Sequence, residues 1–179
     1  MGDDMTESSH RSPARPLPAD PIDLAHERWR DEGWAQAAAG MAVVTSIMRV
    51  QQVLLARVEA ILRPIGLTFA RYEVLMLLRF SRRGSLPVGK IGERLQVHPA
   101  SVTNAVQRLE QVGFVTRTAN PADGRSVLAK ITTSGRRITD VATSRLNADV
   151  FSIVPLSPAE QREVYVVLKA LRRAFGDFR

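Results

Sequence analysis

HPASVTNAVQRLEQVGFVTRTANPADGRSVLAKI, residues 98–131, contains two adjacent local patterns that decide the fold. Apolar residues recur at three- and four-residue steps between Pro99 and Gly113, which indicates a helix with one buried face. Proline is favoured at the first position of a helix and glycine just after its end. The first half of the stretch therefore predicts a helix over about 99–112.

The second half of the stretch predicts a β-hairpin. Two short runs rich in β-branched residues, 114–118 and 126–132, flank the turn sequence NPADGR at 120–125. Proline, aspartate and glycine in such a position are typical of a tight connection between antiparallel strands. The hairpin follows directly after the predicted helix.

A shorter helix precedes these elements. The segment PVGKIGERLQ, residues 87–96, begins with a proline and places Val88, Ile91 and Leu95 on one face. Two short helices joined by so tight a link form a helix-turn-helix, and a hairpin directly after the second helix lies in the position of a wing. The predicted fold is mainly α with a small β-hairpin wing.

The outward face of the second helix carries side chains that can bond to base edges or phosphates. A solvated helix face more often shows Glu and Lys, whereas here the only acid is Glu110, near the far end. Arg125 at the hairpin tip suits the narrow minor groove of DNA, although an arginine in a turn can also be simply solvated. The polar face consists of Ser101, Thr103, Asn104, Gln107 and Arg108.

The charge distribution supports an anionic partner. The chain has a formal net charge of +7, but residues 1–40 carry eight acids against four arginines. Residues 85–137 carry eight bases against three acids. A basic central block favours a polyanion such as double-stranded DNA, and the alternative is that these are ordinary solvated charges.

The flanking segments predict further parts. Residues 1–19 are rich in Ser, Pro and charge and are expected to be a disordered tail, followed by an accessory N-terminal helix within 20–40. Long amphipathic helices over 41–66 and 133–179 have more apolar positions than one small lobe can cover, which predicts a helical homodimerisation region. Residues 67–132 are expected to form the winged helix-turn-helix lobe, in which Thr68 caps a helix. Thr133 or Ser134 is expected to cap the helix that follows the lobe, and Ser157-Pro158-Ala159-Glu160 predicts a capping box at the start of the last helix.

Several classes of function are excluded by composition. Cys is absent, and His10, His26 and His98 stand far apart, so we expect no metal site and no cofactor. No nucleophile, base and orienting acid can be assembled, so no catalytic residues and no enzyme activity are expected. Arg49, Gln51, Gln52, Arg57 and Glu59 interrupt the most apolar helix, which argues against a membrane span and for a cytoplasmic protein.

The order of these elements resembles the MarR family (multiple antibiotic resistance regulator) of winged helix-turn-helix transcriptional regulators. The resemblance covers roughly residues 41–175 and is carried by LTFARYEVLMLL at 67–78, HPASVTNAVQRLEQVGFV at 98–115 and NPADGRSVLAKITTSG at 120–135. It implies an intertwined homodimer that binds a pseudo-palindromic operator through successive major grooves. It also implies phosphate contacts from Lys90 and Arg94, base or phosphate contacts from the polar face, and Arg125 in the minor groove.

The resemblance further implies a repressor that is released by a small aromatic or phenolic ligand. The accessory helix with Trp29 is similar to that of a urate-responsive subgroup, but Ala105 and Thr118 stand where that subgroup has arginines, which argues against urate. Arg71 and Tyr72 lie near the expected effector pocket, where they would contact an aromatic acid or serve a structural role. The alternative function is a sequence-independent architectural DNA-binding protein without an effector.

Overall fold

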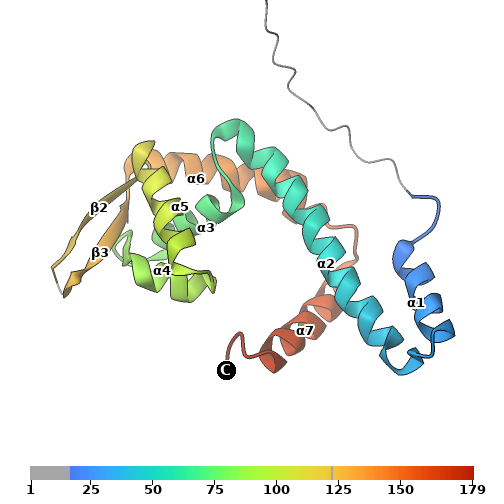
Figure 1. Cartoon of the computed structure of the whole chain (residues 1–179). Helices are drawn as coiled ribbons and strands as arrows, with labels where there is room; N and C mark the ends of the chain where they lie inside the picture. The colour runs from blue at the N-terminus through green and yellow to red at the C-terminus, as the bar shows by residue number, and fades with distance from the viewer. Residues whose placement is uncertain (1–16, 122) are drawn as a thin grey trace, which may run out of the picture. The chain divides into compact units, whose positions relative to one another are not determined.

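The computed structural model describes residues 17–121 and 123–179 (Figure 1). The chain forms two compact units that divide after Val53. Helices predominate, with one small antiparallel sheet, which confirms the predicted fold class. Most of the tail predicted for 1–19 lies outside the described residues. Its last part, 17–19, is exposed and is neither helix nor strand.

The N-terminal unit holds α1 (Pro21–Asp31) and most of α2 (Ala35–Leu62). Asp20 caps α1, because its side chain accepts a backbone N–H of the first turn at 2.8 Å. Gly33 adopts φ 84°, the left-handed conformation in which glycine ends helices. The accessory helix therefore ends earlier than predicted, and α2 begins before the predicted start at Met41 because an alanine-rich segment follows the turn.

α2 carries many exposed apolar side chains. By length and composition alone, Ala35–Ile65 is long and apolar enough to cross a membrane. The charged residues that were expected to argue against a membrane span are too few to change this result. An apolar helix that packs against other protein meets the same criterion, so the criterion by itself does not place α2 in lipid. The side chains that are 48–59% exposed are Val43, Val44, Met48, Val50 and Val53.

The core of the C-terminal unit lies between four helices and the sheet. Thr68 caps the first of these helices through its side-chain oxygen, as predicted. Before it, the 3₁₀ turn η1 (Arg63–Ile65) closes α2, and Gly66 at φ 77° redirects the chain. Leu62, Leu75, Leu78, Ile91 and Leu109 are fully buried. The helices are α3 (Phe69–Phe80), α4 (Val88–Leu95), α5 (Pro99–Gln111) and α6 (Thr133–Leu146).

The sheet has three antiparallel strands in the order β1-β3-β2. The predicted hairpin is present, and its strands run closer to the turn than the predicted 114–118 and 126–132. The strand β1 was not predicted, because three residues ending in proline carry no strand pattern of their own. It exists through pairing of Leu86 with Ala129. The strands are β1 (Ser85–Pro87), β2 (Val115–Asn120) and β3 (Asp123–Ile131).

The start of α6 packs tightly against the chain between α5 and β2. Thr132 caps α6, rather than the predicted Thr133 or Ser134, and its hydroxyl donates to the Gly113 carbonyl at 2.8 Å. The Thr132 N–H donates to the Phe114 carbonyl at 3.0 Å. In the first turn of α6, a Cβ added at Gly135 would clash with that same carbonyl.

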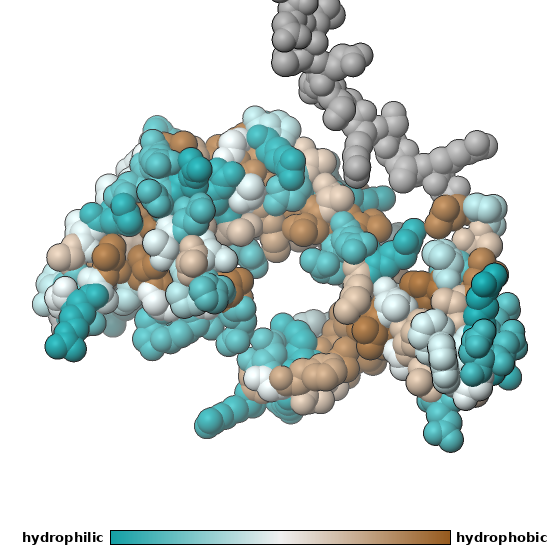
Figure 2. All heavy atoms as spheres, viewed as in Figure 1, coloured by the Kyte–Doolittle hydropathy of each residue, from teal (hydrophilic) through white to brown (hydrophobic). Residues whose placement is uncertain are grey.

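The C-terminal helix α7 (Pro158–Ala174) follows the π-helical turn η2 (Asn147–Phe151). Its predicted capping box is confirmed, since Ser157 and Glu160 each bond to the other's backbone N–H. α7 contains no buried residue, and Figure 2 shows apolar side chains on its surface. The exposed apolar residues are Val164, Tyr165, Val166, Val167 and Leu168.

Candidate nucleic-acid interface

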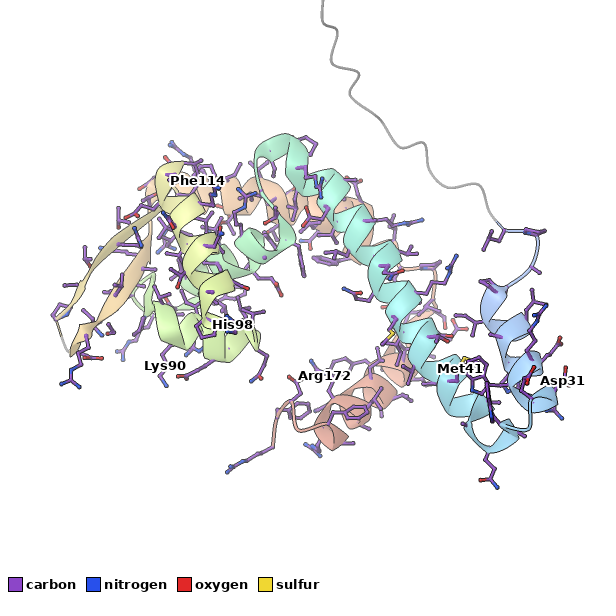
Figure 3. All side chains as sticks on the ribbon, in the orientation of Figure 1. Asp31, Met41, Lys90, His98, Phe114 and Arg172 are labelled. Carbon is purple, nitrogen blue, oxygen red and sulfur yellow. The ribbon has the colours of Figure 1, made fainter. Side chains whose placement is uncertain are left out.

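The helix-turn-helix is formed by α4 and α5 with a three-residue link. Gln96 ends α4 in the left-handed conformation (φ 53°), and His98 caps α5 by accepting the Ala100 N–H at 3.2 Å. Gly92 lets the two helices cross closely, because a Cβ there would lie 3.3 Å from Val102 Cγ2. The buried side of α5 is thereby fixed against the lobe, and its other side faces solvent (Figure 3).

All five residues of the predicted polar face are exposed on α5. Ser101, Asn104 and Arg108 follow one another at helical spacing, and the structure places them along a single open hollow. Thr103 lies beside a second hollow, bordered by α4, and its hydroxyl donates to the Pro99 carbonyl at 3.0 Å. The face therefore presents amide, hydroxyl and guanidinium groups to solvent.

Lys90 and Arg94, predicted as phosphate contacts, are both exposed on α4. Lys90 is not a free charge, since its Nζ lies 2.7 Å from Glu93 Oε2. Arg94 has no ion pair within the described residues. A phosphate at Lys90 would have to compete with the Glu93 carboxylate. Counting basic residues in the sequence does not show that this charge is already paired.

The wing turn is held by its own polar side chains. Asp123 Oδ1 accepts the backbone N–H of Arg125 at 3.1 Å, and Ser126 Oγ bonds to the Asp123 carbonyl at 3.1 Å. Asn120 Nδ2 donates to Ser126 Oγ at 2.8 Å, across the hairpin. Arg125 is exposed. Asp123 thus shapes the turn from which Arg125 projects.

An ion pair joins the second helix to the wing. Arg117 Nε on β2 lies 2.6 Å from Glu110 Oε2 on α5, with both side chains about one-third exposed. The pair links the end of α5 to the strand that carries the wing. Sequence reasoning missed it, because the two residues are seven apart and lie in different elements.

The hollow along α5 is bordered on its other side by the start of α3. It has a volume of about 740 Å³, and Arg71 reaches it from α3. Three alanines keep it open, and neither Asp nor Glu is among the residues that line it. The lining residues are Thr68, Ala70, Arg71, Ala100, Ser101, Asn104, Ala105 and Arg108.

The three residues predicted for an effector pocket occupy different surroundings. Arg71 lies at the hollow, whereas Tyr72 is buried in the core and its hydroxyl is 3.0 Å from Thr143 Oγ1. Trp29 belongs to the N-terminal unit, where its ring meets that of Trp34 edge-on at 5.3 Å. The geometry of the C-terminal unit thus brings Arg71, but not Tyr72, to the side chains of α5.

Two carboxyl groups are perturbed. Half-burial raises the pKa of Glu73 on α3, which has no charged partner within the described residues. Hydrogen bonds from Ser157 lower the pKa of Glu160 at the start of α7. Residues 17–121 and 123–179 contain no group of three His, Cys, Asp or Glu side chains that could hold a metal ion.

Comparisons with known proteins match this architecture. The model of the MarR family matches residues 67–127. The chain is 31% identical over 126 residues to the HTH-type transcriptional repressor Mb2911 from Mycobacterium bovis, an alignment that covers 70% of this chain and 89% of that protein.

Solved structures agree. Sco5413, a MarR family transcriptional regulator from Streptomyces coelicolor, shares 51% identity with a TM-score of 0.72 and covers 78% of this chain and 97% of its own. A mutant MarR from E. coli, complexed with operator DNA, shares 25% identity with a TM-score of 0.69 over 75% of this chain and 96% of its own.

The relatives are named as transcriptional regulators and repressors rather than enzymes, as expected for this chain. The predicted family resemblance is confirmed by the family match, the curated relative and the solved structure at 51% identity. The chain belongs to the MarR family of transcriptional regulators.

Proposed function

We propose that this chain is a sequence-specific DNA-binding repressor that acts as a cytoplasmic homodimer and leaves its operator when a small aromatic or phenolic ligand binds. The observation that carries the proposal is the exposure, on one lobe, of the polar face of α5 together with Arg125 of the wing. The relative Mb2911, named as a repressor, and the E. coli MarR structure with operator DNA support it.

The polar face has the chemistry that reading base edges requires. An α-helix about 10–12 Å across fits the major groove, which is about 12 Å wide. Asn104 and Gln107 carry amides that can bond to adenine with both donor and acceptor, and Arg108 can donate either to the two acceptors of guanine or to a phosphate. Ser101 and Thr103 can bond to bases or phosphates. Arg125 would enter the adjacent minor groove, where a narrow groove attracts guanidinium groups.

The dimer part of the proposal rests on exposed apolar side chains. A helix such as α7, with five exposed apolar residues in sequence and none buried, is stabilised when a second protein surface covers it. We apply the same argument to α2, because Arg49, near the middle of Ala35–Ile65, would cost roughly 2.5–3.5 kcal/mol at the centre of a bilayer. Two copies related by a two-fold axis would present two α5 helices to a pseudo-palindromic site.

The effector part of the proposal concerns Trp29, Arg71 and Tyr72. A ligand that binds the Tyr72 hydroxyl would have to replace its contact with Thr143 Oγ1. A phenolate or carboxylate ligand would need a cationic partner, which Arg71 can provide. The test is a panel of aromatic acids and phenols added to the protein–operator complex, with release of labelled DNA as the readout. If every ligand class fails to release DNA, the effector part is wrong and the DNA-binding part stands.

Sequence specificity is tested by titrating the chain against the DNA beside its own gene and against a scrambled duplex. A specific regulator should prefer its site by about 10³-fold or more. Asn104→Ala should lower that ratio, because it removes a base contact. Asn147→Ala, the same change at an exposed position on η2, is the control and should leave it unchanged. Equal affinities of the wild-type protein for both duplexes would instead favour an architectural protein.

Dimerisation is tested on α7. Leu168→Asp would place a charge within the covered surface and should convert the dimer into monomers in light scattering. Lys169→Asp introduces the same residue at the neighbouring exposed position and serves as the control. A Leu168→Asp protein that stays dimeric would contradict the interface.

A further inference from the structure

We propose that Arg71, which lies outside the helix-turn-helix, is a DNA contact, and that the hollow between the start of α3 and α5 holds one backbone phosphate of the operator. The proposal deepens the proposed function and rests on it. It adds, for the DNA-bound protein, a phosphate contact to the effector role proposed for Arg71 above.

The charge of the hollow is the first observation. Arg71 and Arg108 both line it, one from α3 and one from α5, together with the hydroxyl of Ser101 and the amide of Asn104. No carboxylate lines it, and neither arginine has an ion pair within residues 17–121 and 123–179. Two guanidinium groups that line one open space and have no carboxylate partner there attract an oxyanion, and guanidinium groups bind phosphate oxygens with two parallel hydrogen bonds.

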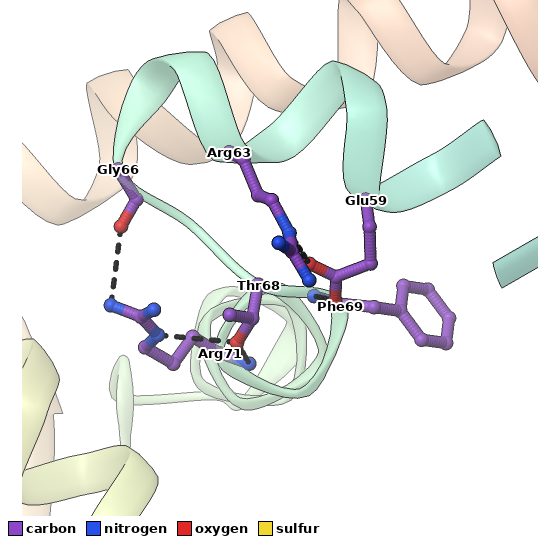
Figure 4. A network of polar contacts seen from close by, with 6 residues as sticks. All are labelled: Glu59, Arg63, Gly66, Thr68, Phe69 and Arg71. Carbon is purple, nitrogen blue, oxygen red and sulfur yellow. Dashed lines mark hydrogen bonds and ion pairs between the residues drawn. The ribbon is translucent and has the colours of Figure 1, made fainter. Parts of the chain in front are cut away.

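The orientation of Arg71 is the second observation. Its Nε donates to Thr68 Oγ1 at 3.1 Å, and its Nη1 donates to the Gly66 carbonyl at 3.2 Å (Figure 4). These bonds hold the guanidinium against the turn that precedes α3 and leave its other N–H groups for a ligand. A side chain that is already held loses less conformational entropy when it binds.

The turn itself is braced. Glu59 Oε1 accepts the Phe69 N–H at 2.8 Å, and its other oxygen accepts Arg63 Nε at 3.1 Å. Thr68 both caps α3 and accepts from Arg71. The network in Figure 4 therefore joins the end of α2, the turn and the start of α3 into one polar unit that carries Arg71.

The position of the hollow selects the DNA backbone as the source of the anion. If α5 lies in the major groove, the phosphates of the two strands border it on either side. The hollow runs along the side of α5 defined by Ser101, Asn104 and Arg108, and Arg71 forms its far wall. Arg71 on this far wall would therefore contact the sugar–phosphate backbone at the edge of the groove rather than a base edge. Small residues at Ala70, Ala100 and Ala105 leave room for a phosphodiester.

The first experiment measures the salt dependence of operator binding for the wild-type protein and Arg71→Gln. One phosphate contact contributes about 0.9 to the slope of log K against log salt, so the slope should fall by about that amount. The advantage of the wild-type protein over the variant should then shrink about 3.5-fold between 50 and 200 mM salt. The loss should be equal on operator and scrambled DNA, because phosphates carry no sequence information.

Arg82→Gln is the matched control. It removes the same charge from an exposed arginine just beyond the other end of α3, in the same unit and without an ion pair within the described residues. Its slope should equal that of the wild-type protein. Thermal unfolding of Arg71→Gln checks that the turn is intact, and Arg71→Lys, which keeps the charge, should retain most of the slope.

The second experiment locates the phosphate. Operator duplexes in which single phosphates are replaced by neutral methylphosphonates are titrated with the wild-type protein and with Arg71→Gln. One position should weaken wild-type binding and leave the variant unaffected. If no position behaves in this way, or if Arg71→Gln keeps the wild-type slope, the phosphate contact is wrong. A wild-type protein that does not discriminate operator from scrambled DNA would refute the proposed function instead.

Discussion

Replacing Gly135 with alanine should destabilise the DNA-binding lobe, although alanine is the better helix former. Gly135 lies in the first turn of α6, where φ is not positive and alanine is conformationally allowed. A Cβ at this position would fall well inside van der Waals contact with the Phe114 carbonyl oxygen and 2.9 Å from Ile131 Cγ1. The first of these neighbours is backbone, which cannot rotate away as a flexible side chain can.

Two opposing effects decide the magnitude. The helix propensity of alanine and the lower entropy of its unfolded chain favour the variant by about 0.5–1 kcal/mol. Overpacking at a close backbone contact costs about 1–3 kcal/mol. The Phe114 carbonyl also accepts the Thr132 N–H, so moving it disturbs the cap of α6. We expect a net loss of about 1–2 kcal/mol, since the steric cost exceeds the gain in propensity.

The assay is thermal unfolding at fixed protomer concentration, because the melting temperature of an oligomer depends on concentration. A loss of about 1–2 kcal/mol corresponds to a decrease in Tm of about 2–8 °C for a chain of this size. Gly89→Ala is the control: this glycine lies in α4 with nothing within 4 Å of its added Cβ, so its Tm should stay or rise. A Gly135→Ala protein at least as stable as the wild type would refute the packing argument.

Three further predictions concern the lobe. Arg125→Ala should weaken operator binding by about 1–3 kcal/mol in fluorescence anisotropy without changing the mass in light scattering, and unchanged affinity would remove the wing from the interface. A double-mutant cycle of Glu110→Ala and Arg117→Ala should give a coupling energy of only about 0.2–1 kcal/mol in urea unfolding, because the pair is partly solvated, and zero coupling would mean that the contact does not stabilise the fold. Burial disfavours the charged carboxylate of Glu73 and so raises its pKa in the folded protein. The folded protein is therefore most stable, as far as Glu73 is concerned, below the pKa that this group has in the unfolded chain, and it loses that stability as pH rises through the higher pKa of the folded protein. Glu73→Gln should therefore match the wild type at acidic pH and exceed its urea midpoint near pH 7, and equal midpoints at both pH values would contradict the burial argument.

Features with a local cause were predictable from the sequence. Pro99 and Gly113 delimit α5 because their backbone preferences act within one or two residues of the helix end. The capping box at Ser157 is equally local and is present as predicted. The polar face of α5 followed from helical spacing alone, and all of its members are exposed.

Features that depend on distant partners were not predictable. β1 is a strand only because Leu86 pairs with Ala129, more than forty residues later in the chain. Tyr72 and Arg71 are neighbours in sequence, yet one is buried against Thr143 and the other lines the hollow, because consecutive side chains on a helix point about 100° apart.

The ion pair between Lys90 and Glu93 has a consequence for searching along a chromosome. To bind a phosphate, Lys90 would have to exchange the Glu93 carboxylate for a phosphate oxygen, so the free energy gained at any one phosphate is reduced by the strength of that ion pair. The negative charge of Glu93 also repels the phosphates of DNA. The ion pair therefore weakens non-specific binding to the many other sites on a chromosome. Discrimination between sites is left to the side chains that contact base edges.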